Sequence, residues 1–220
     1  MIPKIIHYCW ISGEENMPED IKRYIESWHK YLPEYKFINW NDTNFNWNLC
    51  DFTKHCREHD LYAFCADYIR YWALYNYGGI YLDCDVEVFK SFNDLLHMKR
   101  ILTSEVGQDT NRIEAAILGC EKGDEYFGRL MRFYTKCVMR PLPNSDNLYL
   151  VAPDIMKIAC DHYKYSIINI DSPEEESPNN KDICLLDAIK YFDSEHMSDN
   201  TIARHQFKNS WVKTLYGNDT

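Results

Sequence analysis

Residues 78–88 read GGIYLDCDVEV, and the fold of the chain is best inferred outward from this stretch. After two glycines, apolar residues alternate with Tyr81, Asp83, Asp85 and Glu87. Such alternation predicts a β-strand, because successive side chains of a strand point to opposite faces. Asp83 and Asp85 are then expected on one face, close together. Since like charges repel at short range, the pair is expected to hold a cation rather than to stabilise the fold.

The composition predicts one folded domain over residues 1–220, with enough chain for a substantial core. The formal net charge of −10 argues against nucleic acid as a partner, because nucleic-acid binding depends on Lys and Arg that neutralise phosphates. Nine cysteines are scattered without a CxxC pair, which favours a reduced, cytoplasmic location. Apolar runs are too short for a membrane span, and the N-terminus resembles a first strand rather than a signal peptide.

Strands and helices alternate along the chain, which predicts an α/β domain. Besides the acidic strand, strands are expected at 4–10, 35–41, 100–106, 113–119, 165–170 and 183–189. Helices are expected at 18–31, 51–59, 61–77, 123–140 and 152–163. The acidic, proline-broken segment 171–182 predicts a mobile loop.

The helix before the acidic strand adds a second charged pair. Asp67 and Arg70 are three residues apart, and therefore on one helix face, among apolar neighbours. Ligands of open α/β sheets bind beyond the carboxyl ends of strands, where Asp83 and Asp85 are expected. Two carboxylates there suit Mg²⁺ or Mn²⁺, whose other positions can take phosphate oxygens. The alternatives are a solvated acidic edge strand and a purely structural Asp67–Arg70 pair.

Several motifs resemble one family, in the same order along the chain. ADYIRYWALYNYGGIYLDCDVEV (66–88) resembles the signature of the DXD-containing sugar transferases, which include bacterial capsule and lipopolysaccharide glycosyltransferases and the yeast outer-chain initiating mannosyltransferase. The glucosylating domain of large clostridial toxins is a more distant relative. IPKIIHYCW (2–10), IESWHKYLPEYKFINWN (25–41), IEAAILGCEKG (113–123) and ARHQFKNSW (203–211) resemble further segments of that family.

The resemblance implies a single-domain, GT-A-type, Rossmann-like nucleotide-sugar fold with a mostly parallel central sheet. It also implies a metal-dependent, retaining transfer of a hexose from a nucleotide sugar, most commonly UDP-linked, to a glycan or lipid-linked saccharide in polysaccharide biosynthesis. By the same resemblance, Trp10 stacks on the base of the donor. Asp67 and Arg70 hold hydroxyls of the donor sugar, with Tyr81 nearby.

The resemblance implies that Asp83 faces the ribose and the metal, and that Asp85 binds the Mn²⁺ or Mg²⁺ that bridges the diphosphate. His205, Ser210 and Trp211 then close over metal and diphosphate from the segment 200–214. Because both acids of the pair are committed to metal and no other carboxylate stands out as a nucleophile, retention is expected to proceed by front-face displacement. In that route, a diphosphate oxygen helps to deprotonate the acceptor hydroxyl.

Three positions depart from the family pattern. Ala66 stands where the family often has Ser, and Gln206 replaces a second His of the closing motif. Glu114 stands where relatives often carry an Asn near the sugar or acceptor. These departures bear on the identity of the donor more than on the class of reaction.

Other readings of the sequence lead to alternative predictions. The Asp83–Val88 stretch also fits the DxDxx[TV] loop of haloacid-dehalogenase-type phosphohydrolases, and a non-catalytic nucleotide-sugar-binding protein would carry the same residues. Arg129, Arg132, Lys136 and Arg140 line one face of a helix, which is either solvated or in peripheral contact with the inner face of the cell membrane. His55 and His59 are expected at the surface rather than on a metal, and His7 in the core.

Overall fold

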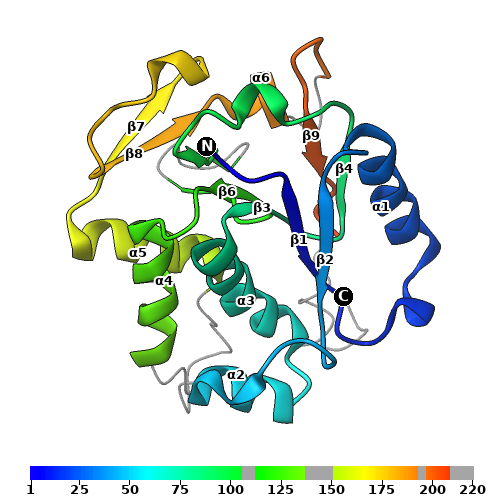
Figure 1. The fold of residues 1–220 in the computed structure, drawn as a ribbon. Coiled ribbons are helices and arrows are strands. Elements are labelled where there is room, and N and C mark those ends of the chain that lie inside the picture. Colours follow the sequence, from blue (N-terminus) through cyan, green and yellow to red (C-terminus); the bar gives the residue numbers. More distant parts are fainter. Residues whose placement is uncertain (106–111, 137–150, 193–196, 209–220) are drawn as a thin grey trace.

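The structure, a computed structural model, describes residues 1–105, 112–136, 151–192 and 197–208. At its centre is a five-stranded sheet with the strand order β2-β1-β3-β6-β5 (Figure 1). The strands are β1 (Ile5–Cys9), β2 (Lys36–Trp40), β3 (Gly79–Leu82), β5 (Arg100–Ile101) and β6 (Ile117–Cys120). β1 pairs in parallel with β2 and β3, whereas β6 is antiparallel to both β3 and β5. All strands except β6 therefore run the same way, which confirms the predicted mostly parallel sheet.

Helices and two small sheets surround this central sheet. The described helices are α1 (Glu19–Tyr31), α2 (Asp51–Glu58), α3 (Tyr62–Tyr77), α4 (Glu125–Lys136), α5 (Ala152–Tyr163) and α6 (Ala188–Phe192). β4 (Val86–Val88) pairs antiparallel with β9 (Ala203–His205), and β7 (Ser166–Ile170) pairs in parallel with β8 (Asp182–Leu186). Short 3₁₀ helices lie at Glu14–Asn16, Trp47–Leu49, Asn93–Leu95 and Pro173–Glu175.

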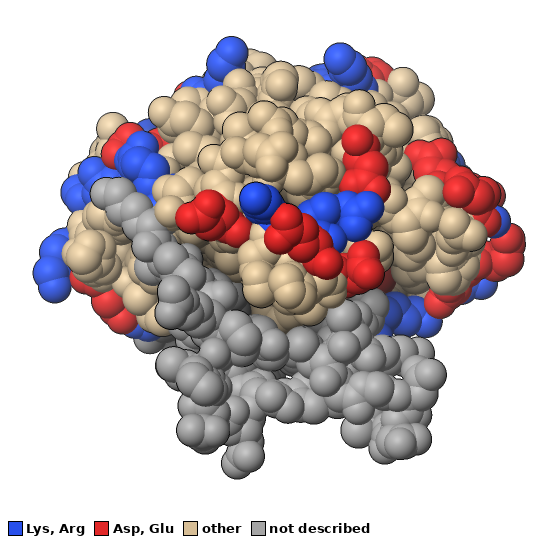
Figure 2. Space-filling view, turned by 90° about the horizontal axis from the view of Figure 1, so that it is seen from below, with Lys and Arg blue, Asp and Glu red and all other residues tan. Residues whose placement is uncertain are grey.

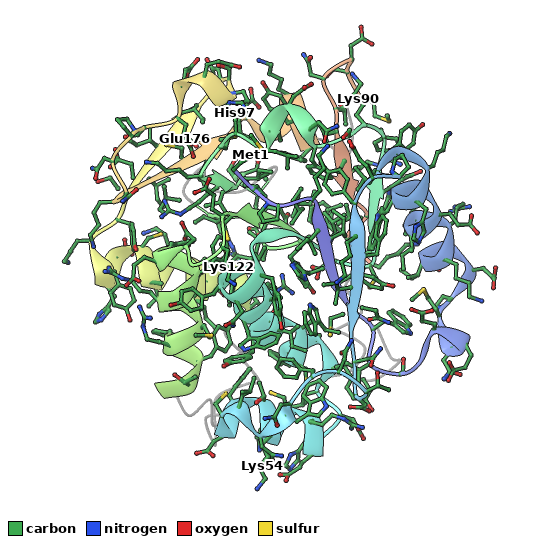
Figure 3. All side chains as sticks on the ribbon, in the orientation of Figure 1. Met1, Lys54, Lys90, His97, Lys122 and Glu176 are labelled. Carbon is green, nitrogen blue, oxygen red and sulfur yellow. The ribbon has the colours of Figure 1, made fainter. Side chains whose placement is uncertain are left out.

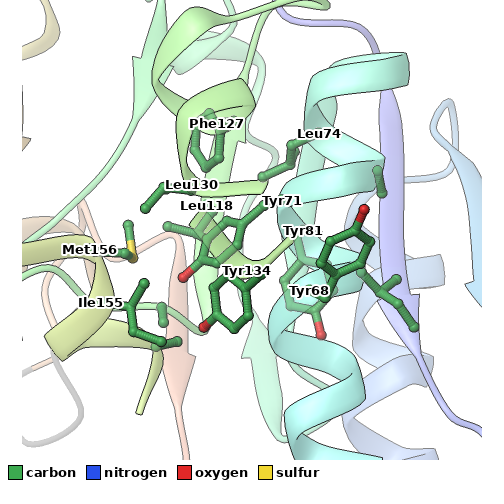
Figure 4. Packing of buried hydrophobic residues seen from close by; sticks show 14 of the residues in the cluster. Tyr68, Tyr71, Leu74, Tyr81, Leu118, Phe127, Leu130, Tyr134, Ile155 and Met156 are labelled. Carbon is green, nitrogen blue, oxygen red and sulfur yellow. The ribbon is translucent and has the colours of Figure 1, made fainter. Parts of the chain in front are cut away.

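The alternation of β3 divides the core into two sides. Ile80 and Leu82 are buried against the α1 side, where Trp28 also lies. Tyr81 points the other way, into a cluster built by α3, α4 and α5. Figure 4 shows the rings of Tyr71 and Tyr134 in that cluster, and their centroids lie 5.7 Å apart. Burial of apolar side chains on both faces of the sheet holds the carboxyl end of β3 in place.

The prediction of one continuous strand over residues 78–88 is wrong. β3 ends at Leu82 and β4 begins at Val86, and the two belong to different sheets. A turn separates them, in which the N–H of Val86 donates to the carbonyl of Asp83 at 3.0 Å. Asp is a favoured first residue of such turns. The acidic pair therefore lies on a turn at the edge of the sheet, and not on one face of a strand.

Other predicted elements are shorter than expected. Of the strand expected at 100–106, residue 106 lies outside the described residues, and the described part is regular only at Arg100–Ile101. The strand expected at 113–119 is regular only from Ile117. The strand expected at 183–189 ends at Leu186, after which α6 begins. Instead of continuing as strands, these segments form single β-bridges. Thr103 pairs with Leu186, at the end of β8, and Ser104 pairs with Ile113. Apolar patterning identified these strands, but these tertiary pairings set their ends.

The acidic loop 171–182 is tied to the sheet by one carboxylate. Glu176 (labelled in Figure 3) accepts hydrogen bonds from the backbone N–H of Lys99, at 2.9 and 3.0 Å, and of Arg100, at 3.3 Å. Lys99 also donates its ammonium to the carbonyl of Pro178 at 2.6 Å. These bonds supply partners to backbone groups at the start of β5. The mobility of the rest of the loop stays a prediction.

Asp124 and Arg100 form a buried ion pair that fixes α4. Arg100 Nε lies 2.9 Å from Asp124 Oδ2, and the side chains are only 7% and 9% exposed. Asp124 Oδ1 also accepts the N–H of Tyr126 at 3.0 Å and of Phe127 at 3.3 Å, and thus satisfies free donors at the start of α4. One carboxylate therefore serves both the ion pair and the helix start.

We expect Asp124→Ala to lower the free energy of unfolding by about 4 kcal/mol. About 3 kcal/mol comes from leaving the Arg100 guanidinium buried and unpaired, and about 1 kcal/mol from loss of the helix cap. Urea unfolding followed by circular dichroism measures the difference. Asp161→Ala, which removes an exposed carboxylate paired with Lys157, is the matched control and should cost less than about 0.5 kcal/mol. Equal midpoints for the two variants would contradict this assignment.

His7 is a core residue, as predicted. It is fully buried in β1, its Nε2 lies 2.8 Å from the carbonyl of Gly78, and its Nδ1 accepts from Trp40 Nε1 at 3.2 Å. This arrangement suits the neutral ring, because a proton on Nδ1 would face the indole N–H. Burial lowers the pKa of His7 to about 4, although the bond to Gly78 opposes the shift.

The pKa of His7 predicts a loss of stability in acid. Because the folded-state pKa of about 4 lies below the ordinary value of 6.5, the unfolded chain takes up the proton first as the pH falls through this window. Between pH 7 and pH 5, the wild type should therefore lose about 2 kcal/mol more stability than His7→Gln, whose amide can keep both hydrogen bonds. Urea unfolding at the two pH values tests this. The same pH dependence in both proteins would refute it.

The described surface carries charges of both signs. Figure 2 shows acidic and basic side chains close to one another on the described part of one face. Among the surface ion pairs are Arg57 with Asp42 and Lys4 with Glu34.

Among the helices of the described residues, none has the length and apolar character needed to cross a membrane.

Candidate functional site

Two carboxylates and one imidazole converge at the carboxyl edge of the sheet. Asp83 follows β3, Asp85 lies in the turn before β4, and His205 ends β9. One ligand atom from each lies within 4.8 Å of the other two. The pairing of Val86 with His205 across β4 and β9 explains why a residue 120 positions away in sequence reaches the acidic turn. The predicted metal residues are therefore brought together.

The segment after His205 is anchored on the same turn. Gln206 donates its backbone N–H to the carbonyl of Asp85 at 3.0 Å, and Lys208 donates its N–H to Asp85 Oδ2 at 2.9 Å. The ammonium of Lys208 lies 2.9 Å from Asp20 in α1. Phe207, held between these anchors, has a φ of 49°, and its ring centroid lies 4.1 Å from that of His205. Residues 206–208 are thus held to the acidic turn and to α1.

Arg70 connects the helix pair to the acidic turn. Its Nη2 lies 3.0 Å from Asp67 Oδ1 and 3.3 Å from Asp83 Oδ1. Its Nη1 donates to the carbonyl of Ala115 at 2.6 Å, and its guanidinium lies 4.9 Å from the centroid of the Tyr81 ring. The planar fork of an Arg can make several such contacts at once. Asp67 and Arg70 therefore lie next to Asp83, and their role in binding a donor stays a prediction.

Burial and charge shift the acids of this site in different directions. Burial raises the pKa of Asp67 to about 7, although Arg70 opposes the shift. Burial also raises the pKa of Asp83, against the effect of Arg70. Burial acts on Asp85 in the same sense, but the hydrogen bond and the charge of His205 outweigh it and lower the pKa of Asp85.

The imidazole of His205 lies between two carboxylates. Its Nε2 is 3.3 Å from Asp85 Oδ2, and its Nδ1 is 3.5 Å from Glu114 Oε1. Burial by itself lowers the pKa of His205, but the neighbouring carboxylates of Asp85 and Glu114 raise it to about 10. Because a metal ligand must be deprotonated, a cation at Nε2 would replace the proton that the metal-free site holds there.

The donor set fits a divalent cation. Asp83 and Asp85 offer carboxylate oxygens, the ligands that Mg²⁺ and Mn²⁺ prefer, and His205 offers an imidazole nitrogen. The two acids are partly exposed, so that further positions of a cation would face outward toward a ligand. Arg70 and the backbone N–H of Lys208 satisfy the remaining oxygens of these acids. The arrangement can hold a metal without leaving a buried carboxylate unpaired.

The other predicted site residues lie around the possible metal ligands or outside the described part of the chain. Trp10 follows β1 at the same edge, is half-buried, and donates its indole N–H to the carbonyl of Gly13 at 2.9 Å. Tyr81 is buried beneath the site and donates its hydroxyl to Asp83 Oδ1 at 3.0 Å. Tyr81 thus orients Asp83 from below. Ser210 and Trp211 lie outside the described residues.

Sequence reasoning missed a second charged group close to the site. Glu105 Oε2 lies 2.7 Å from Arg112 Nε, and Arg112 Nη2 lies 3.3 Å from Asp154 at the start of α5. Burial raises the pKa of Glu105 to about 7, although Arg112 opposes the shift. These residues form no motif. The pairing of Ser104 with Ile113 brings Glu105 beside Arg112, and Asp154 joins them from α5, 42 positions after Arg112.

The weaker candidates behave as ordinary surface groups. The rings of His55 and His59 lie 4.2 Å apart, and Nδ1 of His59 bonds to the carbonyl of His55. Among the described residues, no third His, Cys, Asp or Glu joins them in a possible metal site. Arg129 and Arg132 both pair with Glu125. Arg140 lies outside the described residues, and the proposed membrane contact of this face of α4, which includes Lys136, stays a prediction.

Comparison with known proteins supports the resemblance that the motifs suggested. Residues 18–102 match the family model described as a glycosyltransferase sugar-binding region containing a DXD motif. This region holds Asp67, Arg70, Asp83 and Asp85 and ends before His205. The predicted resemblance to DXD-containing sugar transferases is confirmed.

Two relatives illustrate the extent of the similarity. Inositol phosphoceramide mannosyltransferase 3 of Schizosaccharomyces pombe is 32% identical over 137 residues, which cover 60% of this chain and 36% of that protein. A glycosyltransferase of Acanthamoeba polyphaga mimivirus is 36% identical over 109 residues, which cover 47% of this chain and 43% of that protein. The match thus spans less than half the length of each relative.

Solved structures confirm the fold. The PaToxG glycosyltransferase superposes with a TM-score of 0.54 at 19% identity, over 74% of this chain and 70% of that one. A glycosyltransferase involved in the glycosylation of the major capsid of PBCV-1 superposes with a TM-score of 0.50 at 14% identity, over 95% of both chains. The predicted GT-A-type α/β fold is therefore confirmed.

Proposed function

We propose that this protein is a metal-dependent, retaining glycosyltransferase that moves a hexose from a nucleoside-diphosphate sugar to a hydroxyl of a glycan or of a lipid-linked saccharide. The observation that supports the proposal best is the convergence of Asp83, Asp85 and His205 beyond the carboxyl end of β3. The carboxyl edge of an α/β sheet is where such folds bind ligands. The likeness to a glycosyltransferase region over residues 18–102 supports the same reaction class.

The chemistry of the proposed reaction requires positive charge near the leaving group. When the C1–O bond of the donor breaks, negative charge collects on the diphosphate, and a bound divalent cation supplies Lewis-acid stabilisation there. Asp83, Asp85 and His205 would hold that cation. Arg70 keeps the carboxylate of Asp83 fixed, and Asp67 lies beside it, where both can orient sugar hydroxyls. Trp10 lies at the same edge, where its indole face can stack on a base.

Retention by front-face displacement is supported by the partners of the nearby acids. Retaining enzymes that use a covalent intermediate need a free carboxylate nucleophile. Asp67 and Asp83 contact Arg70, and Asp85 contacts His205. Glu114 accepts the N–H of Ala116, and Glu105 pairs with Arg112. Each carboxylate near the metal residues in the described part of the chain is therefore already engaged.

The donor and the acceptor are proposed from the relatives. A UDP-hexose is the first candidate donor, since the predicted family commonly uses one. Three of the relatives are inositol phosphoceramide mannosyltransferases of Schizosaccharomyces pombe, so that a mannose donor and an inositol-phosphate lipid headgroup are included in the proposal. We also propose a cytoplasmic location, supported by the free thiols of the eight cysteines among the described residues.

Incubation with nucleotide sugars tests the proposal directly. The protein, with 1 mM MnCl₂ or with EDTA, would be mixed with UDP-glucose, UDP-galactose or GDP-mannose, and release of the nucleoside diphosphate and the anomeric configuration of the product would be followed by NMR. We expect Mn²⁺-dependent release from at least one donor, with retention. Inversion would contradict the front-face route. Phosphate release from p-nitrophenyl phosphate without donor cleavage would favour the phosphohydrolase, and donor binding without cleavage would favour a non-catalytic binding protein.

A further inference from the structure

Three consecutive residues before β6 contact three different groups of the site. The carbonyl of Ala116 accepts the N–H of Asp83 at 2.9 Å. The carbonyl of Ala115 accepts Arg70 Nη1 at 2.6 Å. Glu114 Oε1 lies 3.5 Å from His205 Nδ1. The segment 114–116 therefore links the sheet edge, the helix pair and the closing segment, although it contributes no ligand to the proposed metal site.

The carboxylate of Glu114 is itself held rigidly. Glu114 is 7% exposed, its Oε1 accepts the N–H of Ala116 at 2.8 Å, and its own N–H donates to the carbonyl of Thr103 at 2.9 Å. A carboxylate fixed in this way cannot follow a rotating imidazole. It can therefore define the orientation of that ring.

The position of Glu114 relative to His205 leaves Nε2 for a metal. Nδ1 faces Glu114 and Nε2 faces Asp85, on opposite sides of the imidazole. His205 Nδ1 is buried and makes no hydrogen bond within the described residues, although the carboxylate of Glu114 lies 3.5 Å from it. Phe207 packs against the ring face. A small shift of the ring toward Glu114 would give a standard hydrogen bond, with Nε2 still directed at the acidic turn.

We propose that Glu114 is a positioning residue that orients His205 through Nδ1, so that Nε2 points at the cation held with Asp83 and Asp85. This inference rests on the proposed metal-dependent function. Metal-binding histidines generally donate their other ring N–H to a carboxylate or carbonyl, which fixes the ring and its tautomer. Loss of such a partner typically costs 10- to 100-fold in metal affinity.

Mn²⁺ binding without donor or acceptor tests this inference. Dissociation constants would be measured by electron paramagnetic resonance for the full chain and for Glu114→Ala, Glu114→Gln and His205→Ala. Glu105→Ala is the matched control, because it removes a half-buried carboxylate that pairs with Arg112 and not with His205. Electron spin echo modulation from a bound imidazole nitrogen gives a second readout, which a purely structural role of Glu114 would leave unchanged.

We expect Glu114→Ala to weaken Mn²⁺ binding 10- to 100-fold and to reduce the imidazole signal, which His205→Ala should abolish. Glu114→Gln keeps an oxygen for both N–H groups and should stay within a few-fold of the wild type. Glu105→Ala should bind Mn²⁺ as the wild type does. Wild-type affinity and signal in Glu114→Ala would overturn the inference, and so would equal losses in the Gln and Ala variants. Because no sugar is used, a failure of the transferase proposal would appear separately, as Mn²⁺ binding without donor cleavage.

Discussion

Asp85→Ala is expected to abolish measurable Mn²⁺ binding at micromolar concentrations and to reduce donor cleavage at least 100-fold. Asp85 contributes a carboxylate to the proposed site and also accepts bonds from His205 and from the N–H of Lys208. Its removal takes away one metal ligand and the anchor of the segment that carries another. Both losses act on stabilisation of the leaving diphosphate, so that kcat should fall more than KM rises.

The control for this variant removes a carboxylate elsewhere. Asp94 is exposed in the 3₁₀ helix Asn93–Leu95, and Asp94→Ala should leave cleavage and Mn²⁺ binding unchanged. Donor cleavage would be measured by release of the nucleoside diphosphate at saturating Mn²⁺. An Asp85→Ala protein that cleaves the donor at the wild-type rate would contradict the role of this residue. Normal circular dichroism of the variant would show that its fold is kept.

Arg70→Met is expected to be the most destabilising single change in the site. Arg70 is 5% exposed and lies between Asp67 and Asp83, so that methionine leaves the buried carboxylate of Asp67 and the partly exposed carboxylate of Asp83 without their cation. Removal of one partner of a buried ion pair costs about 3–5 kcal/mol. Arg70→Lys should recover only part of the lost stability. The guanidinium of Arg70 contacts both carboxylates and also donates to the carbonyl of Ala115, whereas the single ammonium of Lys cannot make all of these contacts at once.

A double variant separates charge from packing. If unpaired charge causes the loss, Asp67→Asn combined with Arg70→Met should be more stable than Arg70→Met alone, since one buried carboxylate has been neutralised. Urea unfolding of the wild type, Asp67→Asn, Arg70→Met and the double variant is compared from pH 6 to pH 9. Because burial raises the pKa of Asp67 to about 7 even beside Arg70, the advantage of the double variant should grow as the pH rises and Asp67 in Arg70→Met loses its proton. A double variant that is less stable than Arg70→Met would show that the guanidinium acts mainly through its contacts with the backbone and with Tyr81.

Local pattern predicted most of the secondary structure and one half of the site. The helix pair Asp67 and Arg70 and the acids Asp83 and Asp85 lie within 19 residues of one another in the sequence. Helical spacing places the first pair on one face, and the end of the predicted strand places the acids near the edge of the sheet. The alternation of Ile80, Tyr81 and Leu82 between the two sides of the core is also as predicted. The turn at 83–85 was missed, because a strand pattern of apolar and polar residues can continue through a turn that joins two different sheets.

The other half of the site depends on pairings that sequence pattern does not encode. His205 was placed by resemblance, and only the β4–β9 ladder shows how it reaches Asp85. Glu114 stood out as a departure from the family pattern, but its contact with His205 spans 91 positions in the chain. Such contacts arise from the packing of segments far apart in the chain, and local sequence propensity does not predict them.

We propose that Asp83, Asp85 and His205 together hold one divalent cation against the diphosphate of a donor. A crystal structure of the protein with Mn²⁺ and UDP, with data collected at the manganese edge, tests this arrangement. We expect one anomalous peak within about 2.5 Å of an oxygen of each Asp and of His205 Nε2, and in contact with the diphosphate. A manganese peak elsewhere, or a bound diphosphate with no metal between it and the two aspartates, would contradict it.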